Sequence, residues 1–307
     1  MATVTTGAIA KALWPGVQGW YQMAYDRFPA ESSQIFTAMS SQKQYEERVA
    51  VSMLGLASEK PEGQNIEYDD FELSYVARFV HKVYAKGIKL TKETIKDNQY
   101  PALARLMQER STALATSMRE TREWVHANVL NRAFTSTYTM GTNHDGQELV
   151  ASDHPLGPYG GTYSNLVSAD LSEAALESAL ILADGFTDAR GLKIKVTGQK
   201  LIVPPALRFE AERLMATTMQ PGTANNDVNA IRSSSALPGN YMVYHYLTDT
   251  DAWFIKTSVD GLITFNSWTM EFGRDEEFDN SNIKFKAEER FSTGWDDAKC
   301  IIGSSGI

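Results

Sequence analysis

The sequence predicts a mixed α+β fold in which helices and antiparallel strands are interleaved irregularly. Three observations support this prediction. Apolar and polar residues alternate over residues 71–84, which indicates a long strand. Apolar residues recur at helical spacing over residues 101–134, which indicates one long helix. The second half of the chain contains short strands without a regular strand–helix–strand rhythm, which argues against a doubly wound parallel sheet.

The composition is that of a folded, soluble protein. The chain has 307 residues, 43% of them hydrophobic and 22% charged, which is enough for a sizeable core. Its formal net charge of −9 argues against broad nucleic-acid binding through basic patches. The single cysteine, Cys300, excludes an internal disulfide framework and fits a reducing cytoplasm. No stretch reaches the roughly 20 apolar residues of a membrane span, and no targeting peptide is recognisable, so an unanchored protein is expected.

The first forty residues combine helix breakers with many aromatic residues. Gly7, Pro15 and Gly16 argue against one long regular element. The aromatic residues, among them Trp14 and Trp20, must nevertheless be buried, because each buries roughly 150–250 Å². Two interpretations stay open: a subdomain packed on its own chain, or an extended arm that buries its aromatic side chains on a neighbouring subunit.

A polar loop and an unusually long strand follow. Residues 55–70 include Pro61 and Gly63 and are expected to form an exposed loop or tip. At about 3.3 Å per residue the strand over residues 71–84 would extend roughly 45 Å, whereas strands usually have about 5–6 residues. A protruding hairpin explains this length better than a compact sheet does.

The next segment prepares the long helix. After a short strand over residues 87–90, Thr91 is a good N-cap for a short helix over residues 92–96. Pro101 then suits the first turn of the helix that runs to about Phe134. At 1.5 Å per residue this helix spans roughly 45–50 Å. Such a helix either bridges subdomains or forms the backbone of a flat molecule.

The remaining pattern predicts two more helices, a long polar loop and a series of short strands. In chain order these are a helix over residues 171–186 capped by Ser168 or Asp170, strands over 193–197 and 200–203 about a turn at Gly198-Gln199, a helix over 206–217, a turn-rich loop over 218–240, and strands over 241–247, 253–257, 262–268, 283–291 and 298–302.

The best candidates for chemistry are His144, Asp145, Asp153 and His154, which share one loop. Imidazoles and carboxylates this close could bind a divalent metal or act as acid and base. Their spacing matches no metal-binding signature, and no regular element is expected to support them. Turn chemistry, in which the carboxylates cap backbone groups, is the favoured interpretation. No nucleotide-binding or hydrolase motif is recognisable, and no catalytic residue, metal or cofactor is predicted.

The order of these elements resembles the Hong Kong 97-type capsid fold, which tailed bacteriophages and encapsulin nanocompartments share. The similarity is greatest to the Mu-like phage head subunits, because residues 153–156, 160–162 and 164–165 (Asp-His-Pro-Leu, Gly-Gly-Thr and Ser-Asn) resemble a segment recurrent in that group. The resemblance implies an N-terminal arm over residues 1–44 and an extended hairpin loop over 45–85. It further implies a peripheral domain over 86–190 and 262–307, with the spine helix at 101–134, and an axial domain over 191–261 with its tip in the loop 218–240.

The resemblance implies a structural major capsid protein rather than an enzyme. Copies would form the hexamers and pentamers of an icosahedral head around double-stranded DNA, without sequence-specific DNA binding and without a membrane. Scaffolding, portal and decoration proteins are the expected partners. The expected location is the virion, after assembly in the host bacterial cytoplasm.

Five aromatic residues are the candidate inter-subunit contacts, although burial within their own chain is equally open for each: Trp14, Trp20, Phe71, Tyr75 and Phe79. Two alternatives to a phage capsid remain at this point. One is an encapsulin-like compartment that holds cargo enzymes. The other, less favoured, is a metal-dependent hydrolase built on His144, Asp153 and His154.

Overall fold

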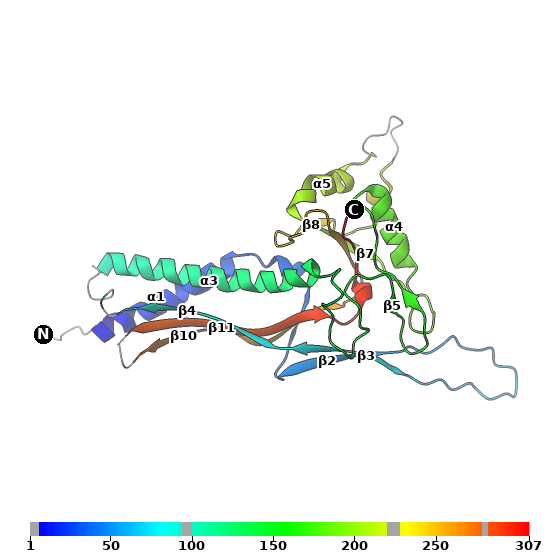
Figure 1. Cartoon of the computed structure of the whole chain (residues 1–307), viewed down its shortest axis with the longest axis horizontal. Coiled ribbons are helices and arrows are strands. Elements are labelled where there is room, and N and C mark those ends of the chain that lie inside the picture. Colours follow the sequence, from blue (N-terminus) through cyan, green and yellow to red (C-terminus); the bar gives the residue numbers. More distant parts are fainter. Residues whose placement is uncertain (1–5, 92, 94–99, 220–227, 278–281, 307) are drawn as a thin grey trace.

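The structure is a computed structural model that describes residues 6–91, 93, 100–219, 228–277 and 282–306, with the side chains of residues 6–14 and 100–104 left out. The molecule is elongated (Figure 1). A layer of helices and long strands forms one end, a second sheet with its own helices stands beside the other end, and a narrow hairpin projects beyond it.

The first sheet consists of four strands in the order β1, β10, β11 and β4. β10 (Leu262–Glu276) and β11 (Ile283–Trp295) are antiparallel and have 15 and 13 residues. β1 (Thr37–Ser40) pairs in parallel with β10, and β4 (Lys82–Leu90) pairs antiparallel with β11. Both long strands were predicted, but with shorter ranges. β10 continues through register shifts around Trp268, where its alternation is interrupted.

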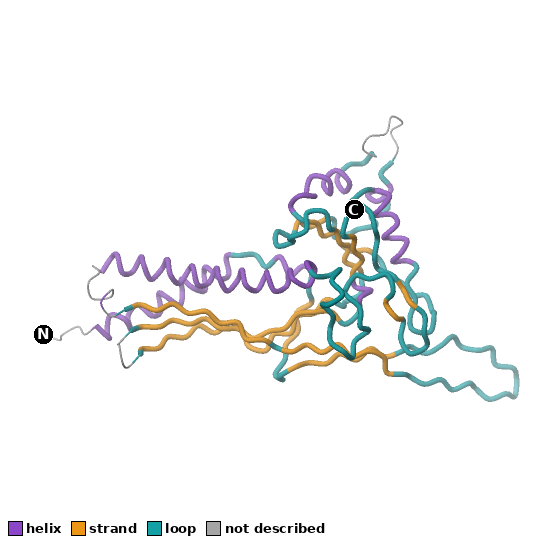
Figure 2. The backbone as a smooth tube through the Cα atoms, viewed as in Figure 1, coloured by secondary structure: helices purple, strands orange, loops and turns teal. Residues whose placement is uncertain are grey.

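Two helices cover one face of this sheet. α3 (Tyr100–Asn131) has 32 residues and confirms the predicted long helix, and α1 (Thr6–Arg27) lies against it (Figure 2). Phe285 is buried beneath these helices, whereas its neighbours Lys284 and Lys286 are exposed on the opposite face. The strand therefore has one apolar and one charged face, as its alternating sequence predicts.

α1 shows that the expected interruption of regular structure near the N-terminus is wrong. The helix runs through Pro15 and presents a buried stripe of Val17, Tyr21 and Ala24. The ring of Tyr21 stacks on Phe272 of β10, with 4.5 Å between ring centroids. Burial of this stripe on α3 and the sheet outweighs the poor helix propensity of proline and glycine.

The strand predicted over residues 71–84 is divided at His81. β3 (Leu73–Val80) pairs antiparallel with β2 (Tyr45–Val51), whereas the chain after His81 pairs with β11 as β4. His81 is buried, and its two ring nitrogens lie 2.9 Å from Oγ of Ser41 and 2.8 Å from Oγ of Ser292. The side chain at the division is thus tied to both neighbouring segments.

The alternation of buried and exposed residues changes phase at this division. Phe79 and His81 are buried, whereas Val83, which the period of two assigns to the same face, is 52% exposed. Tyr84 takes the inward position instead and stacks on Phe291. The phase changes because the chain passes from the β2–β3 hairpin to the first sheet.

The second sheet has the strand order β12, β9, β7 and β8, with β7 and β8 parallel. Its strands are β7 (Gly198–Val203), β8 (Tyr241–Val243), β9 (Trp253–Thr257) and β12 (Ile301–Ser304). Three helices belong to this sheet: α4 (Glu173–Asp184), α5 (Arg208–Ala216) and α6 (Ala230–Ser233). The remaining short elements of the chain are η1 (Glu31–Gln34), η2 (Pro205–Leu207), η3 (Ala298–Cys300), β5 (His154–Pro155) and β6 (Thr162–Tyr163). Residues of α4, α5, β7, β9 and β12 share one apolar core.

Several details of this half differ from the sequence prediction. Residues 193–197 form no strand, and Gly198 lies inside β7 rather than in a turn. A Cβ at Gly198 would come 2.6 Å from Leu180 and 2.8 Å from Leu237, so close packing requires glycine there. Ser172, not Ser168 or Asp170, caps α4 by accepting a hydrogen bond from the backbone N–H of Ala175.

The end of the chain also departs from the predicted pattern. Residues 298–300 form the turn η3, and the strand begins only at Ile301. This strand, β12, pairs with β9 in the second sheet and not with the first sheet. The short helix predicted over residues 92–96 lies outside the described residues. In the part of the chain that is described, no helix is both long and apolar enough to span a bilayer.

Asn165 joins the loop at residues 149–151 to the start of β12 through a buried set of hydrogen bonds. Its side chain is fully buried, and its Oδ1 accepts from the N–H of Ala151 at 2.9 Å. Its Nδ2 lies 2.8–3.1 Å from the carbonyl oxygens of Leu149, Ala298 and Ile301. One amide thus satisfies backbone groups of two segments that are far apart in sequence.

We predict that Asn165→Ala lowers the free energy of unfolding by about 3 kcal/mol or more, because several buried backbone groups lose their partner at about 1–3 kcal/mol each. The adjacent Ser164→Ala is the matched control. Ser164 is only part-buried. Its hydroxyl accepts one hydrogen bond from the N–H of Leu166 at 3.1 Å and lies 3.4–3.5 Å from two carbonyl oxygens, so a loss of less than about 1.5 kcal/mol is expected. Urea unfolding of unassembled subunits measures both values, and equal losses would contradict the role of Asn165.

Candidate assembly surfaces and the buried histidine cluster

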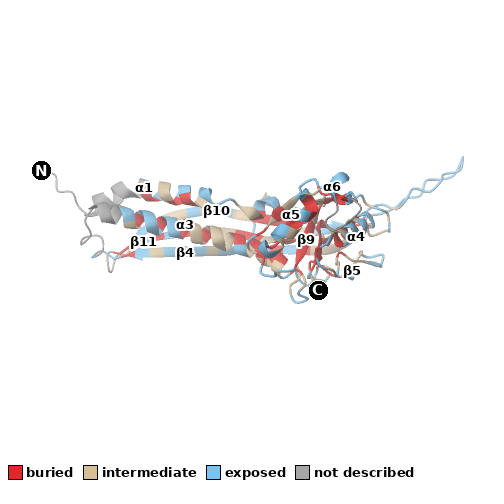
Figure 3. Ribbon diagram, turned by 90° about the horizontal axis from the view of Figure 1, so that it is seen from above, coloured by how far each residue is buried: buried red, intermediate tan, exposed pale blue. Residues whose placement is uncertain are grey.

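The hairpin carries an unusual amount of exposed apolar surface. Leu56, Tyr68 and Leu73 are 83%, 87% and 75% exposed. The other apolar residues exposed there are Met53, Leu54, Ile66 and Phe71. Figure 3 shows the hairpin as an exposed ribbon that extends away from the buried parts of the molecule. Contiguous exposed apolar surface of this kind marks a site of interaction with another macromolecule.

The five candidate contact residues lie in different environments. Phe71 is 60% exposed on the hairpin, and Tyr75 is half-buried near the ring of His144. Phe79 is only 1% exposed and packs edge-to-face on Phe265, with 5.1 Å between ring centroids. Phe79 is therefore a core residue of its own chain and is not available to a neighbour in this conformation. At this position β3 packs against Phe265 of β10 in the first sheet.

The two tryptophans belong to α1. Trp20 is half-buried and lines a groove of about 960 Å³ between α1 and α3. Met23 and Phe28 form the exposed apolar part of this groove, and Thr112 and Thr116 line its α3 side. Trp14 also lies in α1, but its side chain is outside the described part. The groove was not recognised in the sequence, because α1 was not predicted.

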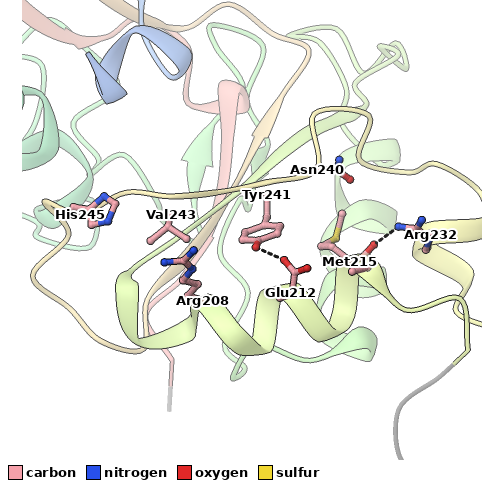
Figure 4. Close-up of a pocket in the computed structure, with 9 residues that line it drawn as sticks. Arg208, Glu212, Met215, Arg232, Asn240, Tyr241, Val243 and His245 are labelled. Carbon is pink, nitrogen blue, oxygen red and sulfur yellow. Dashed lines mark hydrogen bonds between the residues drawn. The ribbon is translucent and has the colours of Figure 1, made fainter. Parts of the chain in front are cut away.

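A second hollow, of about 460 Å³, lies between α5 and the edge strand β8 (Figure 4). The Tyr241 hydroxyl donates a hydrogen bond to the Glu212 carboxylate across it. Arg232 donates to the carbonyl oxygen of Met215 at 2.9 Å. These polar groups satisfy one another, and this arrangement assembles no nucleophile with a base. None of these residues was singled out from the sequence.

The structure brings together three of the four residues that the sequence proposed for chemistry. His154 Nδ1 is hydrogen-bonded to Oδ2 of Asp145 at 2.7 Å, and His144 Nδ1 lies 2.6 Å from Oδ1 of the same carboxylate. All three side chains are buried. Asp153 is exposed and lies outside this cluster. His154 lies in the short strand β5, opposite Tyr163 of β6, and its ring stacks on that tyrosine, whereas His144 and Asp145 lie in a loop.

The electrostatics of the cluster favour a charged, structural arrangement. Burial alone would lower the pKa of His144, but the Asp145 carboxylate and the backbone carbonyl of Asp296 raise this pKa above its ordinary value. Although burial would raise the pKa of Asp145, the two imidazoles hold it well below its usual range. Oδ1 of Asp145 also accepts a hydrogen bond from the N–H of Gln147 at 3.2 Å, which is the predicted turn chemistry.

The arrangement does not form a metal centre. Among the residues that the structure describes, no three His, Cys, Asp or Glu side chains are placed to hold a metal ion. Cys300 is fully buried, and burial raises the pKa of its thiol well above the ordinary value, so it is a poor nucleophile.

The family model for phage capsid proteins matches residues 76–303 of this chain, which is most of its length, and the chain belongs to this family. No curated protein matches the sequence. The match confirms the predicted class, a structural phage capsid protein, and favours it over the encapsulin and hydrolase alternatives.

Solved capsid structures share the fold at low sequence identity. The capsid subunit of the native GTA particle has a TM-score of 0.56 at 14% identity, over 91% of this chain and 90% of that chain. The subunit of Mycobacterium phage Patience has a TM-score of 0.55 at 12% identity, over 99% and 90%. The subunit of the bacteriophage JBD30 procapsid has a TM-score of 0.51 at 15% identity, over 97% and 75%. The predicted α+β capsid fold of the Hong Kong 97 type is thereby confirmed.

We predict that the stability advantage of the wild-type protein over His144→Gln decreases as the pH rises from about 6 to 9. A raised pKa means that protonation of His144 stabilises the fold below its unfolded-state value of 6.5, and this contribution is lost as the pH rises through the folded-state pKa. Urea unfolding at a series of pH values measures the difference.

Taking the difference between the two proteins removes the contribution of titrating groups that are not coupled to His144 through Asp145. Buried His126, whose pKa burial lowers to about 4, destabilises both proteins equally as the medium becomes acidic. A difference that stays constant or grows between about pH 6 and 9 would show that the cluster does not stabilise the protonated imidazole.

Proposed function

We propose that this protein is the major subunit of an icosahedral phage head, in which its copies form hexamers and pentamers around double-stranded DNA. The observation that carries this proposal is the apolar surface of residues 53–73, which projects away from the core of its own chain. Burial of such surface contributes roughly 25 cal/mol per Å², so many modest contacts between copies can stabilise a closed shell. The family membership and the assembled particles of JBD30 and GTA, a procapsid and a capsid, support the same conclusion.

The two apolar surfaces, the hairpin and the groove between α1 and α3, lie toward opposite ends of the elongated molecule. The hairpin projects at one end, and the groove at Trp20 lies between α1 and α3 at the other (Figure 1). Since one chain cannot bring its own hairpin to its own groove, association through these surfaces joins different copies head to tail. Such an interface generates rings when its rotation closes. In this proposal the hairpin of one copy lies over its neighbour, and Phe71 and Tyr75 take part in the contact.

The division of the chain into functional parts is also part of this proposal. Residues 1–44 act as the arm, 45–85 as the extended loop, 86–190 and 262–307 as the peripheral domain, and 191–261 as the axial domain. Two elements depart from these bounds in our proposal. α4 and β12 share one apolar core with β7, β8 and β9, so we assign them to the axial domain instead of the peripheral domain. The tip of that part, residues 218–240, would meet its symmetry mates around a capsomer axis; residues 220–227 of it lie outside the described part of the chain, and α6 lies within it.

The excess of acidic over basic residues supports the proposal that the shell encloses DNA without binding it tightly. A formal net charge of −9 argues against a broad cationic surface for phosphates. We infer that DNA is enclosed without sequence-specific recognition, after assembly in the bacterial cytoplasm. Scaffolding, portal and decoration proteins are the further partners that this function requires or permits.

We predict that Phe71→Ser raises the concentration needed for assembly by about tenfold or more, which corresponds to about 1.4 kcal/mol per subunit. Because the side chain is 60% exposed in the free chain, its removal should shift the thermal midpoint of the subunit by less than about 2 °C. Gln64→Ser, another exposed position of the hairpin, is the matched control and should assemble like the wild type. Light scattering during assembly, combined with calorimetry of free subunits, measures both effects.

The decisive test of the proposed function is the state of the purified protein with and without a scaffolding protein. Sedimentation and negative-stain microscopy should reveal regular hexamers, tubes or shells. A protein that stays monomeric at all concentrations, even with scaffold supplied, would contradict the proposal.

A further inference from the structure

Arg190 connects the projecting hairpin to the body of the molecule. Its Nη1 lies 2.6 Å from Oδ2 of Asp69, and its Nη2 donates to the carbonyl oxygen of Asp70 at 2.8 Å. Nη2 also lies 2.7 Å from the hydroxyl of Tyr159, and the guanidinium sits 4.5 Å from the centroid of that ring. One side chain therefore binds the hairpin on one side and the loop around residue 159 on the other.

The same contact closes the two arms of the hairpin on each other. Oδ2 of Asp69, which binds Arg190, also accepts a hydrogen bond from the N–H of Gly55 at 2.8 Å. Gly55 lies on the outgoing arm and Asp69 on the returning arm. A Cβ at Gly55 would be 3.3 Å from Oδ2 of Asp69, so the arms approach closely at this point. We call Arg190, Asp69, Gly55 and Tyr159 the clasp.

Arg190 is held by a tight turn directly after α4. Oδ1 of Asp188 accepts hydrogen bonds from the N–H groups of Arg190 at 2.9 Å and Leu192 at 2.8 Å. Gly191 supplies the positive φ of 81° that this turn needs. Arg190 itself is only 19% exposed at its side chain. The turn thus presents a guanidinium in a fixed position, which suits bidentate binding.

The ladder of the hairpin ends before the clasp. The last register pair is Val51 with Leu73, followed by a hydrogen bond from the N–H of Ser52 to the carbonyl oxygen of Glu72 at 2.9 Å. The hydrogen bonds between the body and the described part of the hairpin beyond its paired root, residues 53–71, are therefore those of Arg190.

We propose that Arg190 fixes the direction of the hairpin in the free subunit, so that its apolar tip meets a neighbouring copy as a preformed element. This inference rests on the proposed function, since it assigns a purpose to the hairpin in assembly. Ordering a segment before association removes part of the entropy loss on binding. Because the ion pair is partly exposed and screened, it contributes little to global stability. Its effect is on the orientation of the hairpin.

Distance measurements on free subunits test this inference. Spin labels at Glu62→Cys, at the tip, and Glu177→Cys, on α4, occupy exposed positions, while native Cys300 is buried. Pulsed electron paramagnetic resonance on unassembled, doubly labelled subunits gives the distribution of the distance between them. In Arg190→Ala and Asp69→Ala we expect this distribution to broaden by about twofold or more, with an unchanged thermal midpoint.

Asp70→Ala is the matched control. It removes the same charge from the adjacent position, but Arg190 binds the backbone oxygen of Asp70 and not its carboxylate. This variant should keep the narrow distribution of the wild type. A distribution that stays narrow in Arg190→Ala, or that broadens equally in Asp70→Ala, would overturn the inference.

Assembly provides a second and separable readout. The clasp variants should require about tenfold higher concentration to assemble, whereas Asp70→Ala should match the wild type. If the wild-type protein forms no hexamers or shells, the proposed function fails, while the distance distributions still decide whether Arg190 directs the hairpin. If the distributions broaden but assembly of Arg190→Ala is unchanged, a preformed direction is not needed and the inference is contradicted.

Discussion

The long antiparallel pairing of β10 with β11 is the interaction on which the rest of the structure depends. These strands run side by side from Leu262 opposite Trp295 to Glu276 opposite Ile283, and they support α1 and α3 on one face. At the end marked by Trp295 the chain passes through η3 into β12 and so into the second sheet. Because the helices form a single layer on this platform, the molecule is long and thin. The apolar side chains of the projecting hairpin, Leu56 and Tyr68 among them, stay exposed on this platform.

Buried polar contacts determine how distant segments attach to this platform. Both carboxylate oxygens of Glu123, on α3, accept hydrogen bonds from Ser32, at 2.9 Å from its N–H and 2.8 Å from its hydroxyl. Burial raises the pKa of Glu123, and these two bonds offset part of that effect. At the base of the hairpin, His81 bonds Ser41 and Ser292 in the same way. Apolar packing supplies the core, while these contacts specify which segments meet.

The sequence predicted what depends on local periodicity and missed what depends on tertiary contacts. The long helix, the α+β class and the projecting hairpin follow from spacing alone. The helix through Pro15 and the change of phase at His81 do not, because each requires a neighbouring element. The same limit applies to the candidate contacts. Phe71 and Phe79 share one strand phase, yet one is exposed and the other buried, because only the Phe79 end of β3 packs against Phe265 of the first sheet.

In the proposed function, the apolar surface of the hairpin is buried between copies of this chain. Hydroxyl-radical footprinting, applied to free subunits and to assembled shells, tests it most directly. Tyr68 and Phe71 are exposed in the free chain, and Tyr244 is fully buried and serves as the internal reference. If the hairpin is buried between copies, oxidation of Tyr68 and Phe71 should fall severalfold on assembly, while oxidation of Tyr244 stays low. Equal oxidation of Tyr68 and Phe71 in free subunits and in shells would contradict it.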